Sequence, residues 1–237
     1  MRKPLLFIDF DGVICDSVNE CFVSSWLAYS GSRLYEPASI SLSAYSLFRR
    51  YRPLIRRGAD YLLLQRCIDN GVELKNQVEF DRQVAIVGEA GMNAYHRQFY
   101  AARKRLLDED RSYWLKLNTI YPHVFKPLPA AAKSAWILTT KEVLFVLEIL
   151  ASHGLSWNEQ RIICSGTDRK VEVIEKHLDK NDTAVFIDDQ IDHFAGSVDP
   201  RISCYLAAWG YVQPAWLEAR VNVLNERAFA GLIEGVL

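Results

Sequence analysis

The stretch Pro4-Leu5-Leu6-Phe7-Ile8-Asp9-Phe10-Asp11-Gly12 decides the fold that this sequence predicts, because an apolar strand runs directly into two carboxylates. Side chains alternate along a strand, so Asp9 and Asp11 can face one small volume. Two carboxylates in a tight turn repel each other unless a cation or a shared proton compensates. A divalent metal with oxygen ligands fits this pair. Gly12 lets the backbone turn sharply and approach a bound anion.

The overall composition permits a sizeable core and excludes few functions. The chain has 237 residues, half of them hydrophobic, with 28 basic against 29 acidic residues. Such a balance gives no field that attracts nucleic acid or an anionic membrane, so we expect a small or compact substrate. The five cysteines are widely spaced without a CxxC pair, which argues against a disulfide framework and a zinc site. The sequence leaves the oligomeric state open.

Membrane and export signals are not expected either. The longest stretch free of charged residues, 202–217, is shorter than the ~20 residues that a membrane-spanning helix needs. The first four residues lack the apolar segment and cleavage site of a secretory signal. We therefore expect no membrane partner and a cytoplasmic location.

The hydrophobic pattern changes along the chain and predicts two domains. Residues after the acidic loop show helical periodicity for about a hundred positions, whereas the part from Lys133 onward alternates short strands with helices. Strands are expected at 134–138, 161–164, 183–187 and 202–206, and helices at 142–152, 168–178 and 228–234. This alternation predicts an α/β fold with a doubly wound, Rossmann-like parallel sheet. The expected core domain is 1–16 with 120–237, interrupted by a mainly α-helical cap domain, 17–119.

Polar side chains follow each expected strand, where open parallel sheets bind their ligands. They are Asp9 and Asp11 after the first strand, Thr139, Thr140 and Lys141 after the second, 165–170 after the third, and Asp188 and Asp189 after the fourth. A carboxylate can attack phosphorus, hydroxyl and N–H groups can hold phosphoryl oxygens, and lysine can neutralise their charge. The set predicts a site for phosphoryl transfer.

On these motifs the sequence resembles the haloacid dehalogenase superfamily, within it the phosphoglycolate phosphatase and β-phosphoglucomutase-like branch, which carries a helical cap. The motifs are Asp9 to Val13, Thr139 after a hydrophobic strand, Lys170 near a helix start, Asp188-Asp189, and Trp209-Gly210-Tyr211. The resemblance implies that Asp9 is the nucleophile and forms an aspartyl phosphate. It also implies that Asp11 is the general acid and base, and that Lys170 balances the charge of nucleophile and phosphate.

The same resemblance implies a Mg²⁺ cofactor and a set of phosphate-binding residues. The metal ligands would be Asp9, the main-chain carbonyl of Asp11, Asp189, and Asp188 either directly or through one water. The phosphate-binding residues would be Gly12, Thr139, Thr140 and Lys170. The fourth motif departs from the family pattern, since Asp188 stands at a glycine position and Asp192 follows Asp189 by three residues instead of four. The outer metal ligands therefore stay open, and His193 is not expected to be among them.

These arguments predict a Mg²⁺-dependent phosphatase for a small phosphate monoester. Asp11 separates phosphoryl transfer from dehalogenation, in which no leaving oxygen needs a proton. Two alternatives remain, namely a phosphomutase of the β-phosphoglucomutase type and a non-catalytic domain that binds metal or phosphate. Ordinary roles also remain for Thr139 as a helix N-cap, Lys170 as a solvated lysine and Asp192 as a surface acid. The inserted block is longer than a compact cap of the family, which leaves the substrate open.

Overall fold

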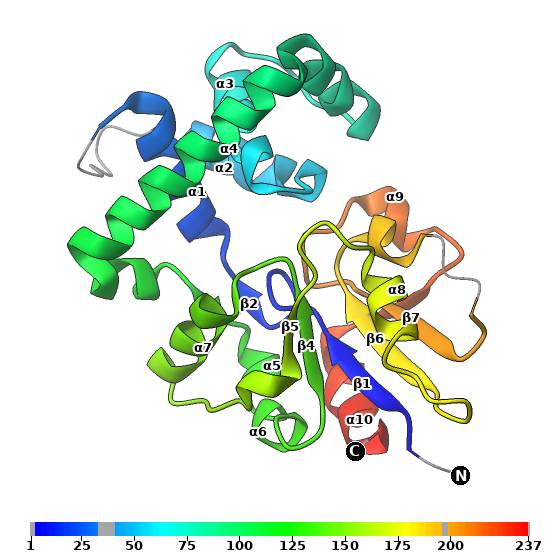
Figure 1. The fold of residues 1–237 in the computed structure, drawn as a ribbon. Helices are drawn as coiled ribbons and strands as arrows, with labels where there is room; N and C mark the ends of the chain where they lie inside the picture. Colours follow the sequence, from blue (N-terminus) through cyan, green and yellow to red (C-terminus); the bar gives the residue numbers. More distant parts are fainter. Residues whose placement is uncertain (1–2, 33–40, 196–198, 237) are drawn as a thin grey trace. The chain divides into compact units, whose positions relative to one another are not determined.

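The computed structural model describes residues 3–32, 41–195 and 199–236 (Figure 1). The chain forms two compact units, one of Met1–Asp16 with Thr119–Leu237 and one of Ser17–Asn118. We call them the core unit and the inserted unit. Within the described ranges, none of the helices combines the length and the apolar character that crossing a membrane requires.

The core unit is built on a six-stranded parallel sheet. The strands lie side by side in the order β5 (Ile162–Cys164), β4 (Trp136–Thr139), β1 (Leu5–Ile8), β6 (Ala184–Asp188), β7 (Ile202–Ala207) and β8 (Asn222–Leu224). Numbered along the chain, this is the order 3-2-1-4-5-6 of doubly wound sheets. The predicted α/β fold with a Rossmann-like parallel sheet is confirmed.

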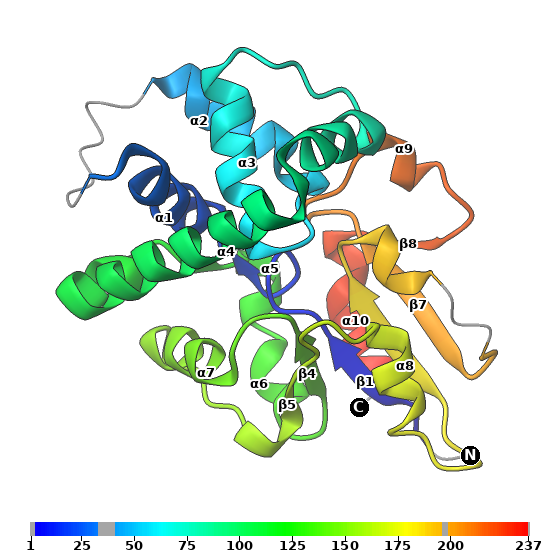
Figure 2. The ribbon, with the colours of Figure 1, turned by 45° about the horizontal axis from the view of Figure 1, so that its top comes forward.

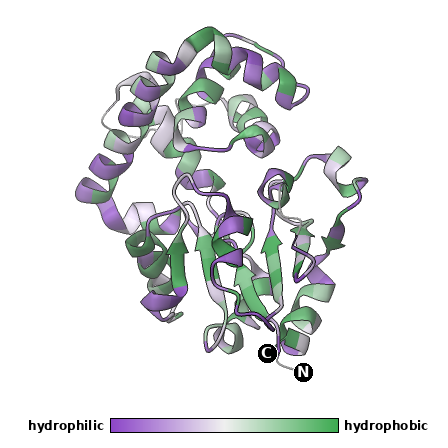
Figure 3. Ribbon diagram, turned by 45° about the vertical axis from the view of Figure 1, so that its right-hand side comes forward, coloured by the Kyte–Doolittle hydropathy of each residue, from purple (hydrophilic) through white to green (hydrophobic). Residues whose placement is uncertain are grey.

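Strand β1 occupies the centre of this sheet and is buried on both faces. Phe7 pairs with Trp136 of β4 on one side and with Phe186 of β6 on the other. Strands covered on both faces carry nearly continuous apolar sequences, which is why the first strand contains Leu, Leu, Phe and Ile in succession. Figure 3 shows the strands of the sheet as predominantly hydrophobic.

Helices cover both faces of the sheet. On one face, α8 (Lys170–Glu175) packs through Val171 and Ile174 against Phe7 and Phe186. On the other face lies α10 (Glu226–Val236), which contacts α5 (Pro122–Phe125) (Figures 1 and 2). Over its described residues, the remaining helices of the core unit are α6 (Leu128–Ala131), α7 (Val143–Ser152), α9 (Pro214–Leu217) and the 3-10 helices η3 (Glu159–Arg161) and η4 (Ile191–Phe194).

A two-stranded antiparallel ribbon carries the chain out of the core unit and back into it. It consists of β2 (Cys15–Asp16) and β3 (Thr119–Ile120), with Asp16 opposite Thr119. We call it the crossing ribbon. Neither this ribbon nor β8 is predicted by the sequence, because strands of two or three residues are too short to show a period.

The inserted unit is mainly α-helical over its described residues. Its helices are α1 (Val18–Ser30), α2 (Leu42–Tyr51), η2 (Arg52–Leu54), α3 (Gly58–Asp69) and α4 (Gln77–Lys116). The long α4 is interrupted at Gly88 and Asp110, where the backbone leaves helical geometry. The Asp110 carboxylate accepts a hydrogen bond from the N–H of Tyr113, so it caps the final turns of α4.

A buried ion pair connects α1 with α4 inside the inserted unit. Arg103 donates from Nε and Nη2 to the two carboxylate oxygens of Glu20, each over 2.8 Å. The hydroxyl of Ser24 donates to the same carboxylate, and the guanidinium lies 4.5 Å from the ring centre of Phe99. Two charges can be buried here because each has its partner and further polar contacts.

Candidate active site

The predicted acidic residues lie at the switch point of the sheet. After β1 the chain continues to β4 on one side, and it later returns to β6 on the other side of β1. Asp9 follows β1 and Asp188 ends β6, and the N–H of Asp9 donates to the carbonyl of Ile187 over 2.9 Å. Doubly wound sheets bind ligands at such a point, so the topology brings together carboxylates that are far apart in sequence.

Lys170 lies between these two carboxylates. Its Nζ is 2.8 Å from Asp9 Oδ1 and 2.8 Å from Asp188 Oδ2. As the first residue of α8 it is only 2% exposed, so the alternative of a solvated surface lysine is wrong. Burial lowers the pKa of Lys170, but Asp188 and Asp9 outweigh this effect, and the pKa stays above its usual value. Lys170 is therefore a permanent positive charge beside Asp9.

Asp9 and Asp188 differ in their electrostatic environment. Burial raises the pKa of the Asp9 carboxyl to about 6, Lys170 opposes this rise, and the negative charge of Asp188 adds to it. Burial also acts on Asp188, but His193 and Lys170 hold its pKa well below the usual value. His193 Nδ1 lies 2.9 Å from Asp188 Oδ2, and the N–H of Gln190 donates to Oδ1 over 2.8 Å. Asp188 is thus a fixed anion, whereas Asp9 responds to added positive charge.

Asp189 packs closely against Gly12 and Gly210. Its Oδ2 accepts a hydrogen bond of 2.7 Å from the N–H of Tyr211. A Cβ on Gly12 would lie 2.0 Å from that oxygen, and one on Gly210 would lie 2.4 Å from the Asp189 Cβ. Gly12 also has φ +86°, so a side chain there would be strained in addition. Its N–H donates to the carbonyl of Cys15 over 2.8 Å. Gly12 therefore provides space for Asp189, and its amide is engaged within the loop.

Asp11 lies beside a second buried lysine. Lys141 Nζ is 3.1 Å from Asp11 Oδ1 and 5.9 Å from the ring centre of Phe10. Lys141 was expected after the second strand, but no role in the site was predicted for it. Only the fold shows that this lysine is buried. The site therefore contains an ammonium group beside each of the first two carboxylates.

Thr139 and Thr140 differ in their surroundings. Thr139 is buried at the end of β4, and its Oγ1 accepts a hydrogen bond of 3.1 Å from the N–H of Lys141. Its carbonyl accepts one of 2.8 Å from the N–H of Ser165 on the loop after β5. Thr140 is exposed. Thr139 is therefore not a helix N-cap, because α7 begins at Val143 after Glu142, and its hydroxyl instead closes the turn that follows β4. The phosphate-binding role of Thr139 stays a prediction.

The residues around Asp9 can accommodate a divalent cation. Ligand atoms of Asp9, Asp188 and His193 lie within 4.8 Å of one another. Four carboxylates face two ammonium groups here, which leaves an excess of two negative charges from these six side chains. They are Asp9, Asp11, Asp188 and Asp189 against Lys141 and Lys170. Carboxylate oxygens are donors for hard cations. His193 was not expected in this group. Asp192 is exposed on η4, as a surface acid would be.

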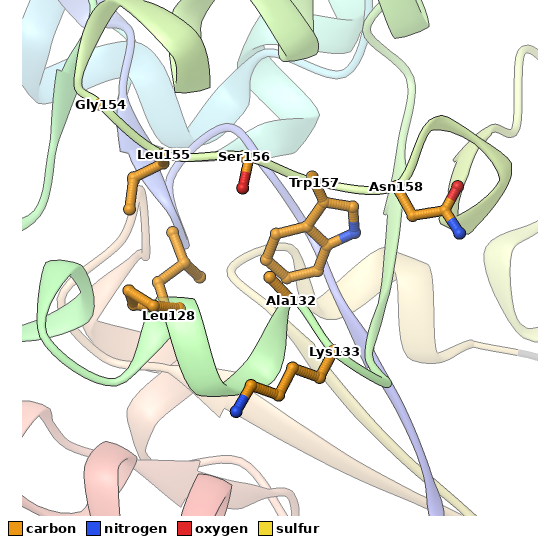
Figure 4. Close-up of a pocket in the computed structure, with 9 residues that line it drawn as sticks. Leu128, Ala132, Lys133, Gly154, Leu155, Ser156, Trp157 and Asn158 are labelled. Carbon is orange, nitrogen blue, oxygen red and sulfur yellow. The ribbon is translucent and has the colours of Figure 1, made fainter.

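A cavity at the end of the sheet opposite the acidic site lacks comparable chemical groups. It has a volume of about 520 Å³ and lies between α6 and the loop that leads to β5, so it is near the beginnings of the strands (Figure 4). Leu128, Leu155 and Trp157 line it, with Lys133 at its edge. None of its lining residues is a carboxylate, a histidine or a cysteine. The switch point is therefore the better candidate for an active site.

The fold and the acidic switch point define a class, the doubly wound α/β proteins that bind their ligand beyond the strand ends. No family model and no curated protein matches this sequence. Solved structures do match it over nearly the full length. A structure from Clostridium acetobutylicum described as a predicted phosphatase has 13% identity and a TM-score of 0.58, covering 99% of both chains. A predicted phosphoglycolate phosphatase from Haemophilus somnus has 17% identity and a TM-score of 0.54, covering 98% of both.

A third similar structure carries the name of the fold. It is a hydrolase of the haloacid dehalogenase-like family from Streptococcus pneumoniae, with 13% identity, a TM-score of 0.58 and 98% of both chains covered. The chain therefore has the haloacid dehalogenase-like fold across both of its units. The resemblance that the sequence motifs predict is confirmed at the level of the fold.

Proposed function

We propose that this protein is a Mg²⁺-dependent phosphatase that hydrolyses a small phosphate monoester. The observation that carries the proposal is the contact of Asp9 with the buried ammonium group of Lys170 at the end of β1. A carboxylate that attacks a phosphate dianion needs positive charge beside it, and this lysine supplies it. The names of the similar structures, which are phosphatases and hydrolases, support the same activity.

The proposed reaction has two steps on one carboxylate. Asp9 attacks phosphorus and forms an aspartyl phosphate, while Asp11 gives a proton to the leaving oxygen of the alcohol. Asp11 then takes a proton from water as the water attacks the phosphoryl group, which releases inorganic phosphate and restores Asp9. Thr139, Thr140 and Lys170 are assigned to the phosphoryl oxygens. The N–H of Gly12 is not, because it already donates to Cys15.

The proposed Mg²⁺ would be held by Asp9, Asp189 and the main-chain carbonyl of Asp11. When bound, it would neutralise the excess negative charge of the site and of the substrate. Both oxygens of Asp188 already accept from protein groups, Oδ2 from Lys170 and Oδ1 from the N–H of Gln190. This favours a contact of Asp188 with the cation through one water.

The inserted unit, residues 17–118, is assigned the role of a cap. In this proposal it selects the alcohol part of the substrate and excludes bulk water during the reaction. The core unit then supplies the chemistry common to all substrates. The substrate is a small phosphorylated compound, and we propose no nucleic acid or membrane partner.

The test is phosphate release from a panel of sugar phosphates, nucleotides, phosphoglycolate and other phosphorylated acids in the presence of Mg²⁺. We expect release from at least one compound, and a loss of about a thousandfold or more in kcat for Asp9→Asn. Asp192→Asn is the matched control, because its carboxylate is exposed, and its kcat should stay within about twofold.

Each alternative function has its own outcome in this assay. Isomerisation of a sugar phosphate without release of phosphate would identify a phosphomutase. No turnover of any compound, combined with binding of Mg²⁺ or phosphate, would identify a non-catalytic domain. Activity that is unchanged in Asp9→Asn would assign the turnover to a contaminant and overturn the mechanism.

A further inference from the structure

Tyr211 contacts two separate parts of the core unit. Its main-chain N–H donates to Asp189 Oδ2 over 2.7 Å, and its phenol donates to Asp16 Oδ1 over 2.9 Å. Asp189 belongs to the proposed cation site, whereas Asp16 ends β2, where the chain leaves the core unit. One buried residue, 6% exposed, thus joins the acidic site to the crossing ribbon.

The neighbours of Tyr211 hold the same acidic loop from other sides. Trp209 Nε1 donates to the carbonyl of Val13 over 3.1 Å. Gly210 lies so close to the loop that a Cβ there would be 2.5 Å from the Gly12 carbonyl. A Cβ on Gly12 would in turn be 2.9 Å from the ring of Tyr211. Because the ring of Tyr211 is confined in this way, we expect its main-chain N–H and its phenol hydroxyl to move together.

We infer that Tyr211 is a positioning residue that couples the Asp189 carboxylate to the crossing ribbon. When Asp189 is fixed, the amide of Tyr211 is fixed with it, and the phenol then holds Asp16 at the last rung of the ribbon. The ribbon carries both passages of the chain between the units, so its stability depends on the state of the acidic site. The inference rests on the proposed function for its meaning, since a bound cation would be the natural event that fixes Asp189.

A double-mutant cycle read by amide hydrogen exchange tests the coupling without any catalytic assay. Exchange is followed in peptides that cover residues 13–17 and 118–122, in the wild type, Asp189→Ala, Tyr211→Phe and the double variant. Tyr211→Phe should speed ribbon exchange about tenfold, because a hydrogen bond to a carboxylate is lost. Asp189→Ala should speed it several-fold in the wild-type background and less than about twofold in the Tyr211→Phe background.

The control and the contrary outcomes are defined by the same measurement. Tyr29→Phe removes a phenol–carboxylate hydrogen bond of 2.8 Å to Asp69 within the inserted unit, and it should leave ribbon exchange unchanged. If the effects of Asp189→Ala and Tyr211→Phe simply add, Tyr211 has only a structural role and the inference is overturned. If Tyr211→Phe does not fold, Asp16→Ala breaks the same contact from the other side and replaces it in the cycle.

Cation binding is measured separately, so that the two proposals can fail independently. Titration calorimetry of the wild type with Mg²⁺ tests the proposed cation site. Where binding occurs, saturating Mg²⁺ should slow ribbon exchange in the wild type and not in Tyr211→Phe. Absence of Mg²⁺ binding and of phosphate release would overturn the proposed function, whereas the mutant cycle would still decide the coupling.

Discussion

The partly exposed carboxylate of Asp11 forms an ion pair with the buried ammonium group of Lys141, whose Nζ lies 3.1 Å from Asp11 Oδ1. The Lys141 side chain is 4% exposed and comes from the loop after β4, whereas the lysine beside Asp9 comes from α8. Each of the two acids at the end of β1 therefore has its own ammonium group. A phosphate dianion that reaches Asp9 would meet both positive charges.

Replacing Lys141 by methionine should lower kcat/KM for phosphate release by about a hundredfold, as loss of one fixed group that stabilises developing charge does. Steady-state kinetics with the best substrate of the panel measures this effect. Lys133→Met is the control, because Lys133 is exposed and lies before β4, at the end of the sheet opposite the acidic site. Equal kinetics for the two variants would remove Lys141 from the site.

Substitution of Gly12 by alanine should disrupt the acidic site by crowding Asp189. The new Cβ would lie 2.0 Å from Asp189 Oδ2, so the carboxylate has to move. Gly154→Ala is matched in backbone strain, since Gly154 has φ +73° but nothing within 4 Å of its Cβ position. We expect about 1 kcal/mol of lost stability from strain in Gly154→Ala and a clearly larger loss in Gly12→Ala.

Calorimetric titration with Mg²⁺ separates crowding at the site from general destabilisation. Gly12→Ala should weaken binding at least tenfold, because Asp189 is displaced, and Gly154→Ala should bind as the wild type does. Unaltered Mg²⁺ affinity in a folded Gly12→Ala protein would show that Asp189 does not contribute to the cation site.

The ion pair between Glu20 and Arg103 predicts a strong non-additive effect on stability. Arg103→Met alone leaves the buried Glu20 carboxylate without its guanidinium partner and should cost about 3–5 kcal/mol. Adding Glu20→Gln removes that charge and should recover a large part of the loss. Denaturant unfolding, followed by protein fluorescence, measures the free energy of unfolding of the wild type, both single variants and the double variant. A double variant as unstable as the sum of the single ones would contradict the prediction.

His123 should make the stability of the core unit sensitive to acid. The ring centres of His123 and Trp209 are 4.7 Å apart. Burial lowers the pKa of His123, and the negative charge of Glu226 raises it by less. The folded state therefore takes up this proton at lower pH than the unfolded state, whose pKa is about 6.5. The contribution is fully present above pH 6.5 and is lost as the pH falls through the lowered pKa.

Unfolding free energies at several pH values between 7 and 5 measure this effect. His123→Phe keeps an aromatic ring without a titrating group, and its stability should fall less over that range than that of the wild type. His96→Phe changes an exposed histidine of the inserted unit and should keep the wild-type pH dependence. The idea fails if His123→Phe and the wild type lose stability in parallel.

The strands of the core could be predicted because burial on both faces leaves a direct trace in composition. Leu5 to Ile8 and Ala184 to Ile187 are nearly continuous apolar runs, and each is followed by acids. The ribbon strand Cys15–Asp16 leaves no such trace. It exists because Thr119–Ile120 returns to pair with it, more than a hundred residues later.

The sequence predicts the site residues that directly follow strands. It does not predict those whose place depends on contacts between distant parts of the chain. Asp9, Asp188 and Lys170 are brought into direct contact. No local pattern in the sequence indicates that Lys141 is buried or that His193 contacts Asp188. Tyr211 and Asp16 are 195 residues apart, and no local pattern could join them. Whether the assigned residues carry out the proposed steps stays a prediction for the assays above.

The position of β1 between β4 and β6 has a consequence for how the molecule is made. Strand β1 leaves the ribosome about 180 residues before its partner β6, and the Trp209 to Tyr211 segment follows later still. Until then Asp9 has neither Lys170 nor Asp188 beside it. This late closure of distant contacts should make refolding of the core slow compared with a helical bundle of similar size.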